Sequence, residues 1–107
     1  MIDIEKLERD LLQAENAARA AKCSDDGTCN FDTLCINLGR NTKALRNALA
    51  SIDWKIVSVG QRGWTGWYFV DLYSLCGMAN CRTAMVEAAK NKMIELGWDA
   101  CVYYMLD

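Results

Sequence analysis

The N-terminal segment carries apolar side chains at intervals of three and four positions. These positions are Ile4, Leu7, Leu11, Ala14, Ala18 and Ala21. Such spacing places the side chains along one face of an α-helix. Asp3 stands just before the first of them, where a carboxylate can accept a hydrogen bond from the first helical turn. We therefore predict an amphipathic helix that begins at residue 4.

A second helix is predicted after a turn-forming segment. Residues 23–30 are rich in Ser, Asp, Gly and Asn, which favour a loop. Helical spacing then resumes at apolar positions, namely Leu34, Leu38, Leu45, Leu49 and Ile52. Asn30 or Asp32 can cap this helix, and Gly39 weakens its middle, so a break near residues 39–41 is compatible with the pattern. Two helices joined by a short loop predict an antiparallel αα-hairpin.

The apolar pattern changes to a period of two in the next segment. Residues 54–59 alternate, and residues 64–73 are rich in aromatic and β-branched side chains. Because a short glycine-containing loop separates the two runs, they predict a β-hairpin. Gly66 within the second run indicates a bulge or a close backbone contact. Unless a bulge intervenes, Trp64 and Trp67 should lie on opposite faces of the sheet.

The C-terminal part predicts a third helix and a last strand. Met85, Ala89, Met93 and Leu96 form one apolar face, Asn80 can cap the helix, and Gly97 can end it. Residues 98–106 alternate again and predict a strand.

The fold class that follows is α+β in a single domain, residues 1–107. It has a helical hairpin, residues 1–52, followed by a ββαβ unit, residues 53–107. We expect a three-stranded, mainly antiparallel sheet with the helices packed on one face. The other face would then carry one of two strongly apolar sets, either Trp67, Phe69 and Tyr73 or Trp64, Tyr68 and Val70. A patch of that kind is typical of a binding surface or of a homodimer contact.

Composition and charge exclude several classes of function. The chain has 107 residues, of which 52 % are hydrophobic, and this suits one domain with a real core. Its formal net charge of −2 does not favour binding by phosphate neutralisation. It contains no run of apolar residues long enough to span a membrane and no apolar signal core near Met1, so we expect a cytoplasmic protein. It also contains no histidine, which rules out a histidine general base or metal ligand within this chain.

Most of the six cysteines are expected to be free thiols in a reducing compartment. Cys76 and Cys81 have C-x4-C spacing, which differs from the C-x-x-C of thioredoxin-like centres. A four-cysteine zinc site that adds Cys23 and Cys29 would have wider pairs than structural zinc sites usually show. A Cys23–Cys29 disulfide is an equal alternative under oxidising conditions. We therefore predict no metal and no cofactor, and keep a thiol or zinc-binding protein as the second alternative function.

Three groups of residues are candidates for ligand binding. The segment 25–32 is acidic, but it lacks the regular ligand positions and the terminal Glu of a calcium loop. Basic residues spaced three apart share a predicted helix face and could contact phosphates or pair with Glu8 and Glu15; they are Arg40, Lys43 and Arg46. Arg62 beside Trp64 and Trp67 could stack on bases. A small nucleic-acid-binding protein is therefore the first alternative function.

The leading hypothesis is a non-enzymatic protein-binding module, because Trp, Tyr and Arg dominate protein interfaces. In size, acidity and general character the chain resembles small inhibitors encoded by phages and mobile elements, such as anti-CRISPR proteins, although no motif matches. That resemblance implies an inhibitor that occludes a site on a host nuclease or CRISPR effector in the bacterial cytoplasm. Acidic side chains could mimic phosphates there, and the expected partner-binding residues are Asp25, Asp26, Asp32, Arg62, Trp64, Trp67 and Asp99.

Overall fold

The computed structural model describes residues 2–21, 33–52, 54–72 and 82–103. Several predictions concern residues outside these ranges and are not addressed by the structure. The acidic residues among them are Asp25, Asp26 and Asp32, and the cysteines are Cys23, Cys29, Cys76 and Cys81. The others are the predicted helix caps Asn30 and Asn80 and the aromatic residue Tyr73.

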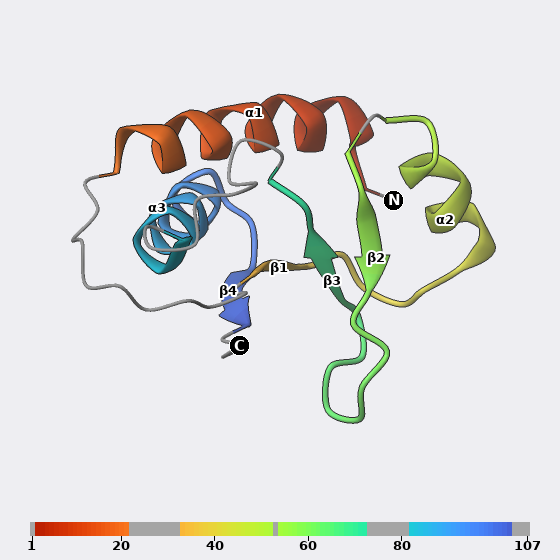
Figure 1. Ribbon diagram of the computed structural model, residues 1–107. Helices are drawn as coiled ribbons and strands as arrows, with labels where there is room; N and C mark the ends of the chain where they lie inside the picture. The colour runs from red at the N-terminus through yellow and green to blue at the C-terminus, as the bar shows by residue number, and fades with distance from the viewer. Residues whose placement is uncertain (1, 22–32, 53, 73–81, 104–107) are drawn as a thin grey trace.

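The described ranges form three helices and a four-stranded sheet. The order along the chain is α1 (Ile4–Ala20), β1 (Thr33–Asn37), α2 (Lys43–Leu49), β2 (Ile56–Ser58), β3 (Trp67–Val70), α3 (Arg82–Glu95) and β4 (Ala100–Tyr103). The strands lie in the order β2-β3-β1-β4, and every neighbouring pair is antiparallel. Apart from α1, this is the β-α-β-β-α-β arrangement called ferredoxin-like. Figure 1 shows α1 lying across one side of the sheet, with α3 near the C-terminal end of α1 and α2 near its N-terminal end.

The predicted first helix is confirmed. The carboxylate of Asp3 accepts a hydrogen bond from the backbone N–H of Lys6 at 3.1 Å, as an N-cap should. Leu7, Leu11 and Ala18 are fully buried in the core. The packing of α1 against α3 is the most extensive contact between described elements.

The predicted αα-hairpin is wrong, because residues 33–37 form a strand. β1 is a central strand that pairs with β3 on one side and β4 on the other. Leu34, Cys35 and Ile36 are all buried, so both faces of this strand are covered. A short apolar run of this kind reads equally well as part of a helix, and pairing with two neighbours outweighs the local spacing. The sheet consequently has four strands and not three.

The second helix is shorter than predicted and is capped by a different residue. It covers only Lys43–Leu49, and the hydroxyl of Thr42 accepts a hydrogen bond from the backbone N–H of Leu45 at 3.1 Å. The predicted caps Asn30 and Asp32 precede β1 in the chain, so they do not cap α2. Gly39 has a φ of 87°, which separates β1 from α2 at the position where a break was expected.

The β-hairpin is confirmed, with shorter strands and a longer loop than predicted. β2 and β3 pair in an antiparallel register that places Val57 opposite Phe69. Gly66 has a φ of 87°, and a Cβ atom there would lie 3.1 Å from Oδ1 of Asn37 and 3.4 Å from the backbone of Gly39. The close backbone approach predicted at Gly66 is therefore present, and only glycine satisfies both requirements.

The third helix is also confirmed, and the last strand is confirmed over Ala100–Tyr103, whereas residues 98 and 99 precede it. Met85, Ala89 and Met93 are buried. Gly97 has a φ of 99°, and the backbone N–H of Trp98 donates to the carbonyl of Met93 at 2.9 Å, which closes the helix. Within the part of the chain that the structure describes, none of the helices is long and apolar enough to cross a membrane.

A buried carboxylate joins α1 to the segment between α3 and β4. Asp10 is 4 % exposed, and its Oδ2 accepts hydrogen bonds from Nζ of Lys6 at 2.7 Å and from Nε1 of Trp98 at 2.8 Å. Lys6 Nζ also donates to the carbonyl of Leu96 at 3.1 Å. Burial alone would raise the pKa of Asp10, but the two hydrogen bonds and the charges of Lys6 and Arg9 outweigh it and lower the pKa.

Candidate functional site

The sheet has one face turned toward the helices and one face turned away from them. Leu34, Ile36 and Val70 belong to the core cluster that contains the buried residues of α1 and α3. Because successive side chains of a strand point to opposite faces, their neighbours point away from the helices. One cross-strand row on that second face consists of Val57, Phe69, Cys35 and Cys101.

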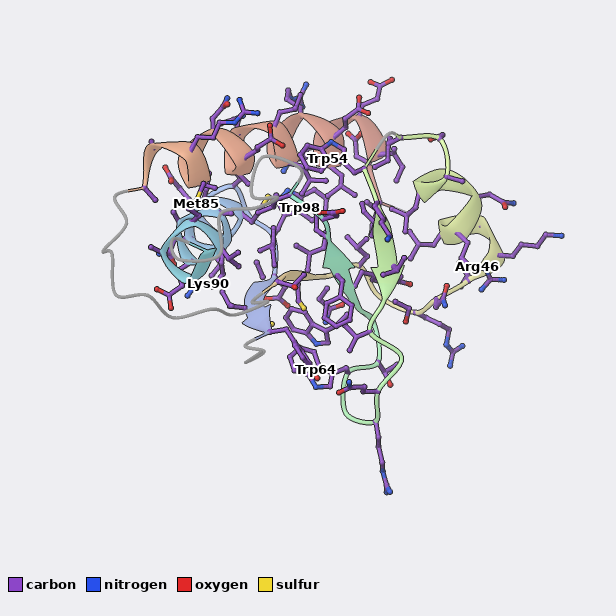
Figure 2. All side chains as sticks on the ribbon, viewed as in Figure 1. Arg46, Trp54, Trp64, Met85, Lys90 and Trp98 are labelled. Carbon is purple, nitrogen blue, oxygen red and sulfur yellow. The ribbon has the colours of Figure 1, made fainter. Side chains whose placement is uncertain are left out.

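An aromatic cluster covers the centre of this second face. The ring centroids of Trp64 and Trp67 are 5.9 Å apart, those of Trp64 and Tyr103 are 5.2 Å apart, and those of Phe69 and Tyr103 are 5.2 Å apart. All four rings are half-buried, and the neighbouring side chain of Val57 is 46 % exposed. Figure 2 shows Trp64 on the side of the sheet opposite Trp54 and Trp98. We call Val57, Trp64, Trp67, Phe69 and Tyr103 the aromatic face.

The two tryptophans share this face because the hairpin loop turns the chain back before β3 begins. The backbone N–H of Trp67 donates to the carbonyl of Trp64 at 3.1 Å, and Gly63 and Gly66 both have positive φ. The rings meet nearly edge to face, with an interplanar angle of 76°. Simple alternation would separate Trp64 from Trp67, so the irregular backbone at Gly66, which the sequence indicated, decides their placement.

A pair of thiols lies beneath the aromatic face. Cys35 and Cys101 are direct cross-strand partners; Cys35 is buried and Cys101 is half-buried, and both are free. Burial, together with the nearby Cys101 thiol, raises the pKa of Cys35 to about 12. Burial also raises the pKa of Cys101, although the contact with Cys35 and the charge of Lys90 oppose this. Both thiols are therefore protonated at neutral pH and are poor nucleophiles.

The described residues contain no cluster of three or more side chains that could hold a metal ion. The four cysteines named for a zinc site lie outside these ranges, so that alternative stays a prediction. Cys35 and Cys101, which no spacing motif singled out, are brought together by the pairing of β1 with β4.

Polar residues border the aromatic face. The hydroxyl of Tyr103 donates to Oε1 of Gln61 at 3.0 Å, and Arg62 is exposed in the same loop. Asn37 is the cross-strand partner of Trp67, and its backbone N–H donates to the carbonyl of Asp99 at 2.9 Å. Of the predicted partner-binding residues, the structure thus brings together Trp64, Trp67 and Asp99, with Arg62 in the adjoining loop. Sequence reasoning missed Val57 and Tyr103, and it named Phe69 only as one alternative.

The basic residues predicted to bind nucleic acid do not join this face. Arg40 precedes α2, and Lys43 and Arg46 lie on it. Arg46 donates to Oδ1 of Asn41 at 3.2 Å. Figure 2 shows Arg46 and Trp64 on different sides of the molecule. The structure therefore separates the two halves of the predicted nucleic-acid site.

The expected ion pairs between α1 and the basic residues of α2 are likewise not formed in the described ranges. Glu15 pairs instead with Arg19, at 2.6 Å between Oε1 and Nη2 on the same helix. Glu8 makes no ion pair with a described residue.

Comparison with protein-family models, with curated proteins and with solved structures finds no match to this chain. The function must therefore be argued from the geometry of the chain itself.

Proposed function

We propose that this chain is a non-enzymatic protein-binding module that docks on an apolar surface of a protein partner through the aromatic face. The observation that carries the proposal is the gathering of four half-buried aromatic rings and the exposed Val57 on the sheet face turned away from the helices. Contiguous apolar patches of this kind mark interaction sites on small proteins. Trp and Tyr are also the residues that most often dominate binding free energy.

The packing of the rings favours a protein partner over unpaired bases. Phe69 and Tyr103 meet at 88°, and Trp64 and Trp67 at 76°, so ring faces are covered by the edges of neighbours. Base stacking needs open ring faces along a positively charged groove. The rows of the aromatic face hold Asn37 and Asp99 beside Trp67 and hold no lysine or arginine among the paired residues of the described strands. The formal net charge of −2 likewise favours a protein partner over a nucleic acid.

The partner that best fits is a folded protein with an apolar ridge and a polar border that can meet Arg62 and Asp99. The general resemblance to phage and mobile-element inhibitors makes a host nuclease complex the first partner class to test. Occlusion of a binding site on that complex, and not catalysis, is then the proposed mode of action. Phosphate mimicry by Asp25, Asp26, Asp32 and Asp99 remains a separate prediction, because Asp99 alone of these four lies in the described ranges.

Single-stranded nucleic acid is the second candidate. RNA-recognition modules are four-stranded sheets whose exposed aromatic side chains stack on bases, and this chain has a sheet of the same size with aromatic residues on its open face. Arg62 in the hairpin loop could contact a phosphate. This candidate requires affinity that falls steeply with salt.

Two variants with the same introduced charge test the proposal. Trp64→Lys places a charge in the aromatic face, whereas Leu12→Lys places it on α1, where Leu12 is 51 % exposed. Tagged wild type and both variants are used to capture partners from bacterial lysate with and without nuclease treatment, and circular dichroism checks folding. We expect a stoichiometric protein that wild type and Leu12→Lys retain and Trp64→Lys loses.

Three results would count against this proposal. Equal capture by both variants would place the interface elsewhere. Capture that disappears with nuclease would favour the second candidate. If light scattering finds only a homodimer that Trp64→Lys dissociates, the aromatic face is a contact between copies of this chain.

A further inference from the structure

A concave site lies between α2 and the β2–β3 hairpin. It has a volume of about 490 Å³, which is within the range of about 300–1,000 Å³ typical of small-molecule sites. Its lining includes Arg46 and Leu49 from α2, Trp54 and Ile56 from the segment that enters β2, and Tyr68 from β3. Figure 2 shows Arg46 and Trp54 on the helical side of the sheet, away from Trp64.

The hydroxyl of Tyr68 is the first sign that this cleft receives a ligand. Tyr68 is 2 % exposed, and its hydroxyl has no hydrogen-bond partner among the described residues. A buried polar group without a partner costs about 1–3 kcal/mol, and native proteins retain few of them. It is the one such side-chain atom found in the part of the chain that the structure describes. A ligand oxygen in the cleft would supply the missing partner.

The charge of the lining indicates the sign of the ligand. The charged residues that border the cleft are Arg46 and Lys55, and both are cationic. Arg46 uses one terminal nitrogen in its bonds to Asn41, at 3.2 Å to Oδ1 and 3.4 Å to the carbonyl. A guanidinium has five N–H donors in a planar fork, so donors remain for a carboxylate. Burial raises the pKa of the Tyr68 hydroxyl, and the positive charge of Arg46 opposes that rise.

The remaining lining indicates the body of the ligand. Leu49, Ile52, Trp54 and Ile56 are apolar and are contributed by α2 and the segment that leads into β2. We propose that this cleft binds a small organic anion, a carboxylate with an apolar body, with Arg46 and Tyr68 on the carboxylate and Leu49, Trp54 and Ile56 around the body. Val57, on the edge strand β2, borders both the cleft and the aromatic face, but the inference does not depend on the proposed protein partner.

Calorimetric titration with octanoate tests the site, because octanoate has both a carboxylate and an apolar chain. We expect saturable binding of one octanoate per chain. Octanol lacks the charge and acetate lacks the apolar body, so each should bind at least about tenfold more weakly, a difference of about 1.4 kcal/mol. No binding of octanoate, or equal binding of octanol, would overturn the proposal.

Three single substitutions then assign the contacts. Arg46→Met and Tyr68→Phe should each weaken octanoate binding about tenfold, which is the scale of a lost hydrogen bond to a charged group. Lys43→Met removes an exposed cation from the same helix, outside the cleft lining, and should leave affinity unchanged. Tyr68→Phe removes only an unpartnered hydroxyl, so the unligated protein should melt no lower than wild type. Affinity that is unchanged in both Arg46→Met and Tyr68→Phe would overturn the assignment.

Discussion

Replacement of Asp10 by Asn tests the buried polar junction between α1 and the start of β4. The substitution keeps the size of the side chain and removes its charge. Asp10 accepts hydrogen bonds from Lys6 at 2.7 Å and from Trp98 at 2.8 Å, and Lys6 also lies 4.8 Å from the centre of the Trp98 ring. We therefore expect Asp10→Asn to loosen the docking of α1 without creating a cavity.

The expected loss follows from the number and type of bonds. Hydrogen bonds to charged groups contribute about 1.5–3 kcal/mol each, and neutral ones about 0.5–1.5 kcal/mol. An amide at position 10 can keep a neutral bond to Trp98 but loses the ion pair with Lys6. The side chain of Lys6 is 41 % exposed, which moderates the loss. We expect the free energy of unfolding to fall by about 2–3 kcal/mol, and the melting temperature by about 10–20 °C for a domain of this size.

Denaturant unfolding near neutral pH and in acid provides the assay. The pKa of Asp10 is lowered from its ordinary value of 3.8, so its contribution is present above that value and is lost as the pH falls through the folded-state pKa. Wild type and Asp10→Asn should therefore differ near neutral pH and converge in acid. Glu8→Gln on the same helix is the control, because Glu8 makes no ion pair with a described residue. If both substitutions cost the same near neutral pH, the junction does not stabilise the fold as argued.

Further predictions concern glycine geometry and the buried thiol. Gly66→Ala should cost about 1 kcal/mol for its positive φ and more for the contact with Asn37 at 3.1 Å. Gly63 has a similar φ, but a Cβ atom there would have no other atom within 4 Å, so Gly63→Ala is the control. Equal decreases in melting temperature for Gly66→Ala and Gly63→Ala would contradict the packing argument. Iodoacetamide should alkylate Cys35 more slowly in the native protein than in the denatured chain, because the native pKa of Cys35 is about 12. Equal alkylation rates of Cys35 in the two states, measured by peptide mapping, would contradict this prediction. Folding raises the pKa of Cys35 from its ordinary value of 9.0 to about 12. The stabilisation by the neutral thiol is therefore present below pH 9.0 and is lost as the pH rises toward 12. If Cys35→Ala and wild type lose stability equally over this alkaline range, this argument is refuted.

The elements that the sequence predicted well are those whose own residues determine their burial. α1 has an apolar seam that follows an Asp cap, and α3 has an apolar seam that ends at Gly97, so the existence of both helices follows from local pattern. The β2–β3 hairpin is similarly signalled by alternation around a glycine-containing loop.

β1 could not be predicted in the same way. Leu34, Cys35 and Ile36 form a short apolar run whose leucine spacing matches a helix that continues to Leu49. Its strand conformation depends on pairing with Phe69 on one side and Cys101 on the other, which are distant in the chain. Such partners are not visible in local periodicity.

Only part of the candidate site could be predicted, because some of its residues are brought together by the pairing of strands that are distant in the chain. Trp64, Trp67 and Arg62 were identified because their residue types are common in interfaces. Tyr103 and Val57 join them only through the strand order β2-β3-β1-β4. The cleft that contains Tyr68 and Arg46 also depends on this order, since it forms where α2 meets the β2–β3 hairpin.

Hydroxyl-radical footprinting of the chain, alone and bound to the protein captured from lysate, tests the central proposal most directly. Aromatic side chains are readily oxidised, so each tryptophan reports its own surface. We predict that Trp64 and Trp67 become protected in the complex, whereas Trp98, on the helical side beside Asp10, does not change. Protection confined to the helical side, with Trp64 and Trp67 oxidised as in the isolated chain, would contradict the proposal that the aromatic face is the binding surface.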